Sequence, residues 1–380
     1  MGNGPDAQWS NMRVLHFFKT YWPDTFGGVV RTIHAIATGT AEHGVESDVL
    51  SLSEKPQANT RRFDGHMAYK AKLDFEVAST GLSRDVFSRF RELSERADII
   101  HYHFPWPMMD VVQLALRPDK PTIVTYHSDI VKQKLLLKFY RPLMNRFLCS
   151  VDKIIATSPN YVATSEVLQR FQNKTTAIPI GLNEADYPAV SEADRLKWRK
   201  RFPRPFFIFV GVLRYYKGLH TLLAAARNSQ TDIVIVGEGP MKAHLMDYAK
   251  EHGLAHVHFV GALSDAEKAT LLDLSIGVVF PSHLRSEAFG LSLVEASMFG
   301  KPMISCEIGT GTSFVNLDGD TGIVIPPDNP DALSFAMQTI AGDANLARKF
   351  AQNARQRYLE NFTAHKMALE YVKIYTSLVP

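Results

Sequence analysis

The sequence predicts an α/β protein of two tandem domains, each built on a doubly wound parallel sheet, with the two domains facing a central cleft. Three observations support this prediction. The chain has 380 residues, more than the ~250–300 residues at which single hydrophobic cores stop growing. Short β-branched or aromatic runs alternate with helical patterns, which is typical of a parallel sheet covered on both faces. A polar stretch separates two series of such runs.

The first series predicts the N-terminal domain, residues 12–185. Helical patterns lie between several of its strands, at 28–43 and 84–96. The first eleven residues, MGNGPDAQWSN, are polar without an apolar signal-peptide region, and we expect residues 1–11 to form a disordered extension. The predicted strands of this series are 13–18, 47–52, 98–102, 121–126 and 153–157.

The second series predicts the C-terminal domain, residues 206–362. The stretch 181–205 before it is polar and contains proline, and we expect residues 186–205 to form the interdomain linker. Ligands of open parallel sheets bind outside the carboxyl ends of the strands, so candidate site residues are sought there. The predicted strands are 206–211, 231–236, 256–260, 276–280, 302–305 and 322–325.

Composition excludes several classes of protein. A hydrophobic content of 46% and a charged content of 21% are those of a globular chain. The net charge of +3 indicates no nucleic-acid partner attracted by bulk charge. Cys149 and Cys306 form no C-x-x-C pattern, which fits a reduced compartment. No apolar run approaches the ~18 residues of a membrane span, and we expect a cytoplasmic protein.

The stretch SEAFGLSLVEASMFGKP, residues 286–302, predicts an anion site. It holds two glutamates eight positions apart, Glu287 and Glu295. The Ala-Phe-Gly after Glu287 indicates a loop that enters a helix, which places Glu287 in the loop and Glu295 in the first turns. A helix N-terminus attracts anions, because its backbone N–H groups and dipole both favour negative charge.

Two further patterns suggest phosphate binding. Arg214 and Lys217 follow strand 206–211, where two cations can neutralise a diphosphate; the alternative is two ordinary surface charges. Gly27 and Gly28 follow strand 13–18 and precede a helix, so their backbone either holds a phosphate or simply allows a tight turn. The dinucleotide fingerprint G-x-G-x-x-G is absent, which argues against a nicotinamide enzyme.

His127 ends strand 121–126, and strand ends are where site residues of α/β domains gather, although a lone histidine is more often structural. No metal site is predicted. His252, His256 and His258 lack carboxylate or cysteine partners at ligand spacing, and 318–320 (DGD) is interpreted as a turn.

Residues 130–151 predict a helix with a basic face. Leu136, Tyr140, Leu143 and Phe147 form an apolar stripe, while Lys134, Lys138 and Arg141 line another face. Lys132 and Arg146 add to the positive charge. The helix is either core-facing with a solvated basic back or a surface that contacts anionic lipid.

Together these motifs resemble the retaining glycosyltransferases of family four, which have the GT-B fold of two Rossmann-like domains. The resemblance extends from about Met12 to the C-terminus. It rests on the Gly-Gly turn, His127, R-x-x-K-G, S-E-A-F-G-L-x-L-x-E-A and G-K-P.

The resemblance implies roles for individual residues. Glu287 and His127 would be the catalytic residues, contacting the donor sugar near the reacting carbon, and Glu295 would bind the ribose. Phe289, Gly311 and Thr312 would line the sugar. No metal or other cofactor would be required. The donor diphosphate would be bound by Arg214, Lys217, Gly28, Gly290 and Leu291.

The resemblance also implies an architecture and a substrate class. The N-terminal domain would bind the acceptor, and the final helix, 363–380, would pack back onto it. FFKTYWPDTFGG, HFPWPMMD, VLRYYKG and EIGTGTSFVN resemble bacterial mannosyl- and rhamnosyltransferases of O-antigen and lipopolysaccharide assembly. These imply a GDP-sugar, an undecaprenyl-diphosphate-linked acceptor and a peripheral location on the cytoplasmic membrane face. A nucleotide-sugar epimerase and a non-catalytic nucleotide-sugar-binding protein are the alternatives.

Overall fold

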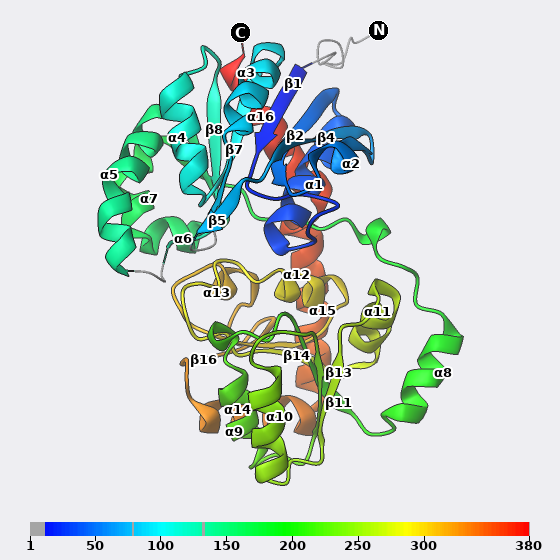
Figure 1. Cartoon of the computed structure of the whole chain (residues 1–380). Helices are drawn as coiled ribbons and strands as arrows, with labels where there is room; N and C mark the ends of the chain where they lie inside the picture. The colour runs from blue at the N-terminus through cyan, green and yellow to red at the C-terminus, as the bar shows by residue number, and fades with distance from the viewer. Residues whose placement is uncertain (1–11, 78–79, 131–133, 380) are drawn as a thin grey trace, which may run out of the picture. The chain divides into compact units, whose positions relative to one another are not determined.

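A computed structural model describes residues 12–77, 80–130 and 134–379 of the protein (Figure 1). The chain divides into two compact units. One comprises the residues up to Gly181 together with those from Ala364 onward, and the other is Leu182–Thr363. Each unit has its own largely parallel sheet, so the predicted two-domain α/β fold is confirmed.

The N-terminal unit is built on an eight-stranded sheet in the order β10-β9-β8-β7-β1-β2-β4-β3. Its strands are parallel except β3, which pairs antiparallel with β4. A separate pair joins β5 and β6. The strands are β1 Met12–Phe17, β2 Val45–Ser53, β3 Arg61–Phe63, β4 His66–Lys72, β5 Phe75–Val77, β6 Thr80–Leu82, β7 Ile99–Phe104, β8 Thr122–Tyr126, β9 Lys153–Ala156 and β10 Thr175–Ala177.

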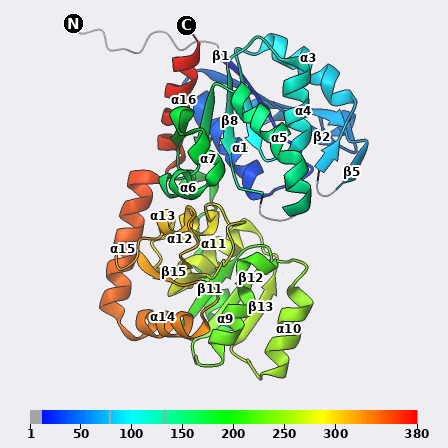
Figure 2. The same cartoon turned by 90° about the vertical axis from the view of Figure 1, so that its left-hand side faces the viewer.

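Helices connect these strands and cover the sheet. The helices of this unit are α1 Gly28–Ala41, α2 Pro56–Asn59, α3 Asp85–Arg96, α4 Pro107–Leu116, α5 Lys134–Ser150, α6 Pro159–Thr164, α7 Glu166–Arg170, the short 3₁₀ helix η1 Gln172–Lys174, and α16 Ala364–Leu378. Helix α16 packs against α1 (Figure 2). A hydrogen bond of 2.8 Å between His101 Nδ1 and the Tyr375 hydroxyl ties α16 to the sheet.

The C-terminal unit is built on a six-stranded parallel sheet in the order β13-β12-β11-β14-β15-β16. All six predicted strands of the second series are present. The strands are β11 Phe206–Val210, β12 Asp232–Val236, β13 Val257–Gly261, β14 Gly277–Phe280, β15 Met303–Cys306 and β16 Gly322–Ile325. The helices are η2 Glu184–Asp186, α8 Glu192–Arg201, η3 Tyr215–Lys217, α9 Leu219–Ala226, α10 Lys242–Glu251, α11 Asp265–Leu274, α12 Leu291–Met298, α13 Thr312–Val315, α14 Pro330–Gly342 and α15 Ala344–Asn361.

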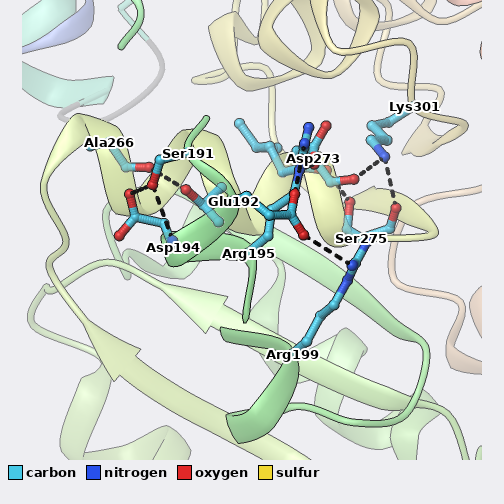
Figure 3. Close-up of polar contacts among 11 residues, drawn as sticks. Ser191, Glu192, Asp194, Arg195, Arg199, Ala266, Asp273, Ser275 and Lys301 are labelled. Carbon is cyan, nitrogen blue, oxygen red and sulfur yellow. Dashed lines mark hydrogen bonds and ion pairs between the residues drawn. The ribbon is translucent and has the colours of Figure 1, made fainter. Parts of the chain in front are cut away.

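The predicted linker at 186–205 is wrong, because helix α8 forms inside it as part of the C-terminal unit. Arg195 pairs with Asp273 of α11 at 2.8 Å (Figure 3). Trp198 is 2% exposed and stacks on Phe202. Trp198 and Phe202 give the helix its buried side. They were overlooked in the sequence because the rest of the segment is polar.

The boundary between the units also differs from the predicted end of the first domain at residue 185. The Leu182 N–H donates to the Phe362 carbonyl at 2.9 Å, and the Tyr358 hydroxyl donates to the Leu182 carbonyl at 2.9 Å. These contacts bind Leu182 to the end of α15, so the C-terminal unit begins there. The predicted extension 1–11 lies outside the described residues. Among the residues that are described, no helix combines the length and the apolar character needed to cross a membrane.

Candidate active site

The strand order of the C-terminal sheet places the candidate site at β11 and β14. These two strands are parallel neighbours although β12 and β13 lie between them in the sequence. The connections from β11 and from β14 therefore leave toward opposite sides of the sheet, which opens a crevice at their carboxyl ends. Both predicted cations and both predicted glutamates follow these strands.

The turn after β11 is fixed against the loop after β14 by a glycine. Gly218 ends η3 in the left-handed region, at φ 69°. A Cβ atom there would lie 1.9 Å from the Pro281 carbonyl oxygen, so no larger residue fits. The His283 N–H also donates to the Tyr216 carbonyl at 3.0 Å. This close approach brings the Lys217 side chain to the loop that holds Glu287.

Lys217 and Glu287 form an ion pair in a largely buried position. Their side chains are 11% and 12% exposed, and the Ser282 hydroxyl donates to the same carboxylate at 3.3 Å. The ammonium group also lies 4.8 Å from the centre of the Phe280 ring. Two predicted site residues are thus in direct contact, and Ser282 is a partner that the sequence analysis missed.

The N-terminus of α12 is open to an anion. Gly290, at φ 90°, precedes the first helical residue, Leu291, and no side chain caps the helix. The first N–H groups of a helix have no intrahelical acceptor, and the first turn of α12 contains no acidic residue to offset the dipole. The Ser292 hydroxyl donates to the Val210 carbonyl at 2.8 Å, which holds this end of α12 against the end of β11.

Glu295 lies further along α12 and has its own buried lysine. Lys268 of α11 pairs with its carboxylate at 2.9 Å, and the Tyr187 hydroxyl donates to the same oxygen at 2.8 Å. Glu295 is 7% exposed. Neither Lys268 nor Tyr187 stood out in the sequence, because they are separated from Glu295 by 27 and 108 positions.

The residues expected to line the donor sugar lie on two segments that pack against each other, one before α12 and one at the start of α13. The Gly311 N–H donates to the Ala288 carbonyl at 2.8 Å, and a Cβ atom on Gly311 would lie 2.6 Å from the Phe289 ring. The Thr312 hydroxyl donates to the Cys306 carbonyl at 3.2 Å. The side chains of Phe289 and Thr312 are 4% and 1% exposed. They shape these segments, so their predicted sugar contact would use backbone groups.

Arg214 is exposed at the start of η3, and its side chain has no partner among the described residues. A second group that sequence reasoning missed supports this turn. His283 lies 2.8 Å from Asp328 through Nδ1, and its Nε2 lies 3.1 Å from the Tyr215 carbonyl. Partial burial acts against ionisation of Asp328, yet the hydrogen bond from His283 keeps its pKa below the usual value.

In the N-terminal unit, Gly28 and His127 lie at the carboxyl ends of β1 and β8. Gly28 begins α1, whose first turn contains no acidic residue and no side-chain cap, so this helix end also suits an anion. His127 is 7% exposed, and burial lowers its pKa to about 3, which keeps the imidazole neutral near pH 7. Its Nε2 lies 3.0 Å from His103 Nδ1.

The three histidines discounted as metal ligands contact groups of their own unit, and His258 Nε2 lies 3.8 Å from Asp232. His252 and His256 contact the Tyr248 and Ala226 carbonyls at 3.0 and 3.1 Å. Asp318 accepts the Val324 N–H at 2.8 Å, and this loop is a turn as predicted. Metal-ligand spacing occurs instead among His220, His283 and Asp328 and among His16, His101 and His103.

The comparisons with known families cover both units. Residues 26–186 match the family described as Glycosyltransferase Family 4, and residues 190–357 match Glycosyl transferases group 1. The chain is 50% identical over 353 residues to the D-rhamnosyltransferase WbpZ of Pseudomonas aeruginosa, covering 93% of each chain. It is 48% identical over 368 residues to the O-antigen chain mannosyltransferase C of Escherichia coli, covering 97% of this chain and 99% of that one.

Solved structures agree on the fold. The sucrose-phosphate synthase of Thermosynechococcus elongatus superposes with a TM-score of 0.78 at 23% identity, over 97% of this chain and 99% of that one. Anabaena HepE in complex with UDP-glucose gives 0.77 at 19% identity, over 97% and 100%.

Proposed function

The chain belongs to the group 1 and family 4 glycosyltransferases with the GT-B fold, and we propose that it transfers mannose or D-rhamnose from a GDP-sugar to a lipid-linked saccharide. Membership of these glycosyltransferase families disfavours both the epimerase and the non-catalytic binding protein. The donor and the acceptor are proposals. They rest on the names of the two relatives described above and on the chemistry of the site.

One observation supports the proposal most directly: the buried Lys217–Glu287 pair lies beside a helix N-terminus without a cap. Breaking the bond between the anomeric carbon and the diphosphate leaves negative charge on the phosphate and positive charge on the sugar ring. Lys217, Arg214 and the first N–H groups of α12 would bind the former, since fixed donors stabilise developing charge best. Glu287 would hold the sugar hydroxyls beside the reacting carbon.

The other proposed contacts complete the donor site. Glu295, fixed by Lys268 and Tyr187, would accept hydrogen bonds from the ribose hydroxyls. Gly28 would approach the phosphates through its backbone, and His127 would contact the sugar through Nδ1, because its Nε2 is occupied by His103. Transfer would retain anomeric configuration, with the acceptor proton passing to the leaving phosphate oxygen. No metal ion would be needed for this step.

A membrane-surface location follows from a lipid-linked acceptor. Helix α5 presents Lys138, Phe139, Arg141 and Arg146 to solvent, and Phe139 is 83% exposed. Phe147, on the predicted apolar stripe, is fully buried. Lys132 and the side chains of Lys134 and Leu136 lie outside the described residues. An exposed aromatic side chain among cations suits an anionic lipid surface, and we propose peripheral attachment to the cytoplasmic membrane face.

The test is a transfer assay with a lipid-linked mannose-terminated acceptor and separate GDP-mannose, GDP-rhamnose and UDP-glucose donors, with and without EDTA. We expect product from a GDP-sugar that EDTA does not abolish. E287Q should lower kcat by about 100-fold or more, because the carboxylate acts on the reacting sugar. It should leave GDP affinity nearly unchanged.

The matched control is E370Q, which removes the exposed carboxylate that pairs with Lys373 on α16. It should retain full activity. Product from UDP-glucose alone would overturn the donor proposal but keep the family. Unchanged transfer by E287Q would overturn the role of Glu287.

A further inference from the structure

Four histidines lie side by side on the N-terminal sheet, three of them completely buried. His16 of β1 is in register with His101 of β7, and His103 follows two positions later on the same face. These three are 0% exposed, and His127 begins the loop after β8. A polar layer of this size inside a sheet is costly unless every ring nitrogen has a partner.

Three of the rings form a continuous hydrogen-bonded chain with a serine. Ser47 Oγ of β2 lies 3.5 Å from His16 Nε2, and His16 Nδ1 lies 3.1 Å from His103 Nε2. His103 Nδ1 then lies 3.0 Å from His127 Nε2. The outer nitrogen of the chain is His127 Nδ1, which has no partner among the described residues.

His101 lies beside this chain without belonging to it. Its Nδ1 contacts the Tyr375 hydroxyl at 2.8 Å, and its Nε2 contacts the Thr125 hydroxyl at 2.7 Å. Both nitrogens are therefore occupied. The nitrogen atoms of His16 and His103 point at one another, not at a common centre with His101, so the arrangement suits hydrogen bonding better than metal coordination.

Burial sets the charge of the chain. It lowers the pKa of His16 and of His127 to about 3 and that of His103 well below its usual value. The titratable groups that act on these rings from outside the chain are His66 and His101, and Tyr371 and Tyr375 lie against His101. All three rings of the chain are neutral at pH 7, so each has one N–H donor and one acceptor nitrogen.

Neutral rings leave only two ways to satisfy both ring-to-ring contacts. If His16 donates from Nδ1, then His103 accepts at Nε2 and donates from Nδ1, and His127 must also have its proton on Nδ1. If His127 donates from Nε2, then His103 and His16 must donate from Nε2 as well. Any mixture faces two protons or two lone pairs across a 3.0 or 3.1 Å contact. The Ser47 hydroxyl accommodates both arrangements, because it can donate or accept.

We propose that Ser47, His16 and His103 form a tautomer relay that decides whether His127 Nδ1 donates or accepts a hydrogen bond. The three rings switch together, so His16 and His103 are positioning residues for His127. That this nitrogen meets a sugar hydroxyl rests on the proposed function, whereas the relay itself does not. At its other end Ser47 lines a cavity of about 320 Å³ with Glu46, Asp64 and His66, where its hydroxyl can change partner.

The first test is ¹⁵N NMR of the full-length protein with labelled histidine, which distinguishes the two neutral tautomers. We expect His16, His103 and His127 to share one tautomer and to show no titration between pH 6 and 8. Rings with different tautomers would overturn the relay. In S47A the orphaned His16 Nε2 should be an acceptor, because an unpaired buried donor is the less tolerated group, so all three rings should adopt the Nδ1–H form. A change confined to His16 would also overturn it.

The second test compares H103F with H101F. Both remove a fully buried imidazole from the same layer, but only H103F interrupts the relay. We expect H103F to give His127 mixed tautomers and to lower kcat by about 10-fold or more with little change in KM for the donor, since a misoriented group affects the reacting geometry. H101F should preserve both values.

Equal effects of H103F and H101F on kcat would assign the layer a purely structural role. The alternative that these histidines bind a metal ion is tested with Zn²⁺. Stoichiometric Zn²⁺ binding that both H103F and H101F abolish would overturn the relay in favour of a metal site. The NMR result needs neither donor nor acceptor. A failure of the GDP-sugar proposal and a failure of the relay are therefore distinguishable.

Discussion

At the scale of single residues, the site is built from charges that neutralise one another inside the protein. Glu287 pairs with Lys217 and Glu295 pairs with Lys268, each with an added hydroxyl donor, Ser282 or Tyr187. A buried carboxylate without a counter-charge would cost several kcal/mol. Each carboxylate therefore has a cationic partner inside the protein, beside the proposed diphosphate site.

Gly218 is the residue whose substitution tests this arrangement most cleanly. G218A should weaken GDP binding by about tenfold or more, because a Cβ atom 1.9 Å from the Pro281 carbonyl must displace the turn that carries Lys217. G253A is the control: Gly253 has φ +64°, close to the +69° of Gly218, but nothing lies within 4 Å of its Cβ position. Calorimetric titration with GDP checks both, and equal losses would show that only backbone strain matters.

At the scale of elements, the parallel sheets place reactive side chains at strand ends, and helices supply charge. Helix α12 contributes its N-terminus, and α11 contributes the lysine that holds Glu295. Helix α5 has a different proposed role, contact with the membrane, because its exposed cations and Phe139 face solvent.

The exposed cations of helix α5 predict that the protein binds anionic membranes. We expect the protein to co-sediment with vesicles of phosphatidylglycerol and phosphatidylethanolamine at low salt. K138A/R141A should weaken binding by about 30-fold, because each cation near such a surface contributes ~1 kcal/mol. The control, R348A/K349A, removes two exposed cations of α15 in the other unit. Equal binding by both double variants would remove α5 from the contact.

At the scale of the whole molecule, buried histidines make the stability of the N-terminal unit depend on pH. Among its described residues the N-terminal unit buries five histidines whose pKa burial lowers: His16, His66, His101, His103 and His127. A histidine whose pKa falls from 6.5 to about 3 on folding binds a proton in the unfolded state first. Stability is therefore full above pH 6.5 and is lost as the pH falls toward 3.

The resulting prediction is acid unfolding of the N-terminal unit under mild conditions. Between pH 8 and 5, His16 and His127 should each lower the free energy of unfolding by about 2 kcal/mol. Asp110, whose pKa burial raises, contributes a slope of opposite sign. The Asp110 contribution is the same in H101F and in the wild type, so it cancels when the two are compared. In urea unfolding at pH 5, 6, 7 and 8, the free energy of unfolding of H101F should depend less steeply on pH. An equal pH dependence of the free energy of unfolding in both proteins would contradict the burial of His101 in its neutral form.

Local patterns determined most of the fold. Runs such as FFIFV at 206–210 bury every residue of β11 and predict a strand without any knowledge of neighbours. The Ala-Phe-Gly after Glu287 likewise predicted a loop that enters a helix, and the structure has Glu287 before α12 and Glu295 within it. Helix α8 was missed because its buried side rests on Trp198 and Phe202 in an otherwise charged segment.

By itself, then, the sequence determined the alternation of strands and helices, the family and the candidate site residues, because each depends on spacing along the chain. Only the tertiary structure decided that Lys217 meets Glu287, that Lys268 meets Glu295 and that His16 meets His103. These partners are 70, 27 and 87 positions apart. Their meeting depends on strand order and register, which arise from the packing of the whole unit, and no local periodicity encodes them.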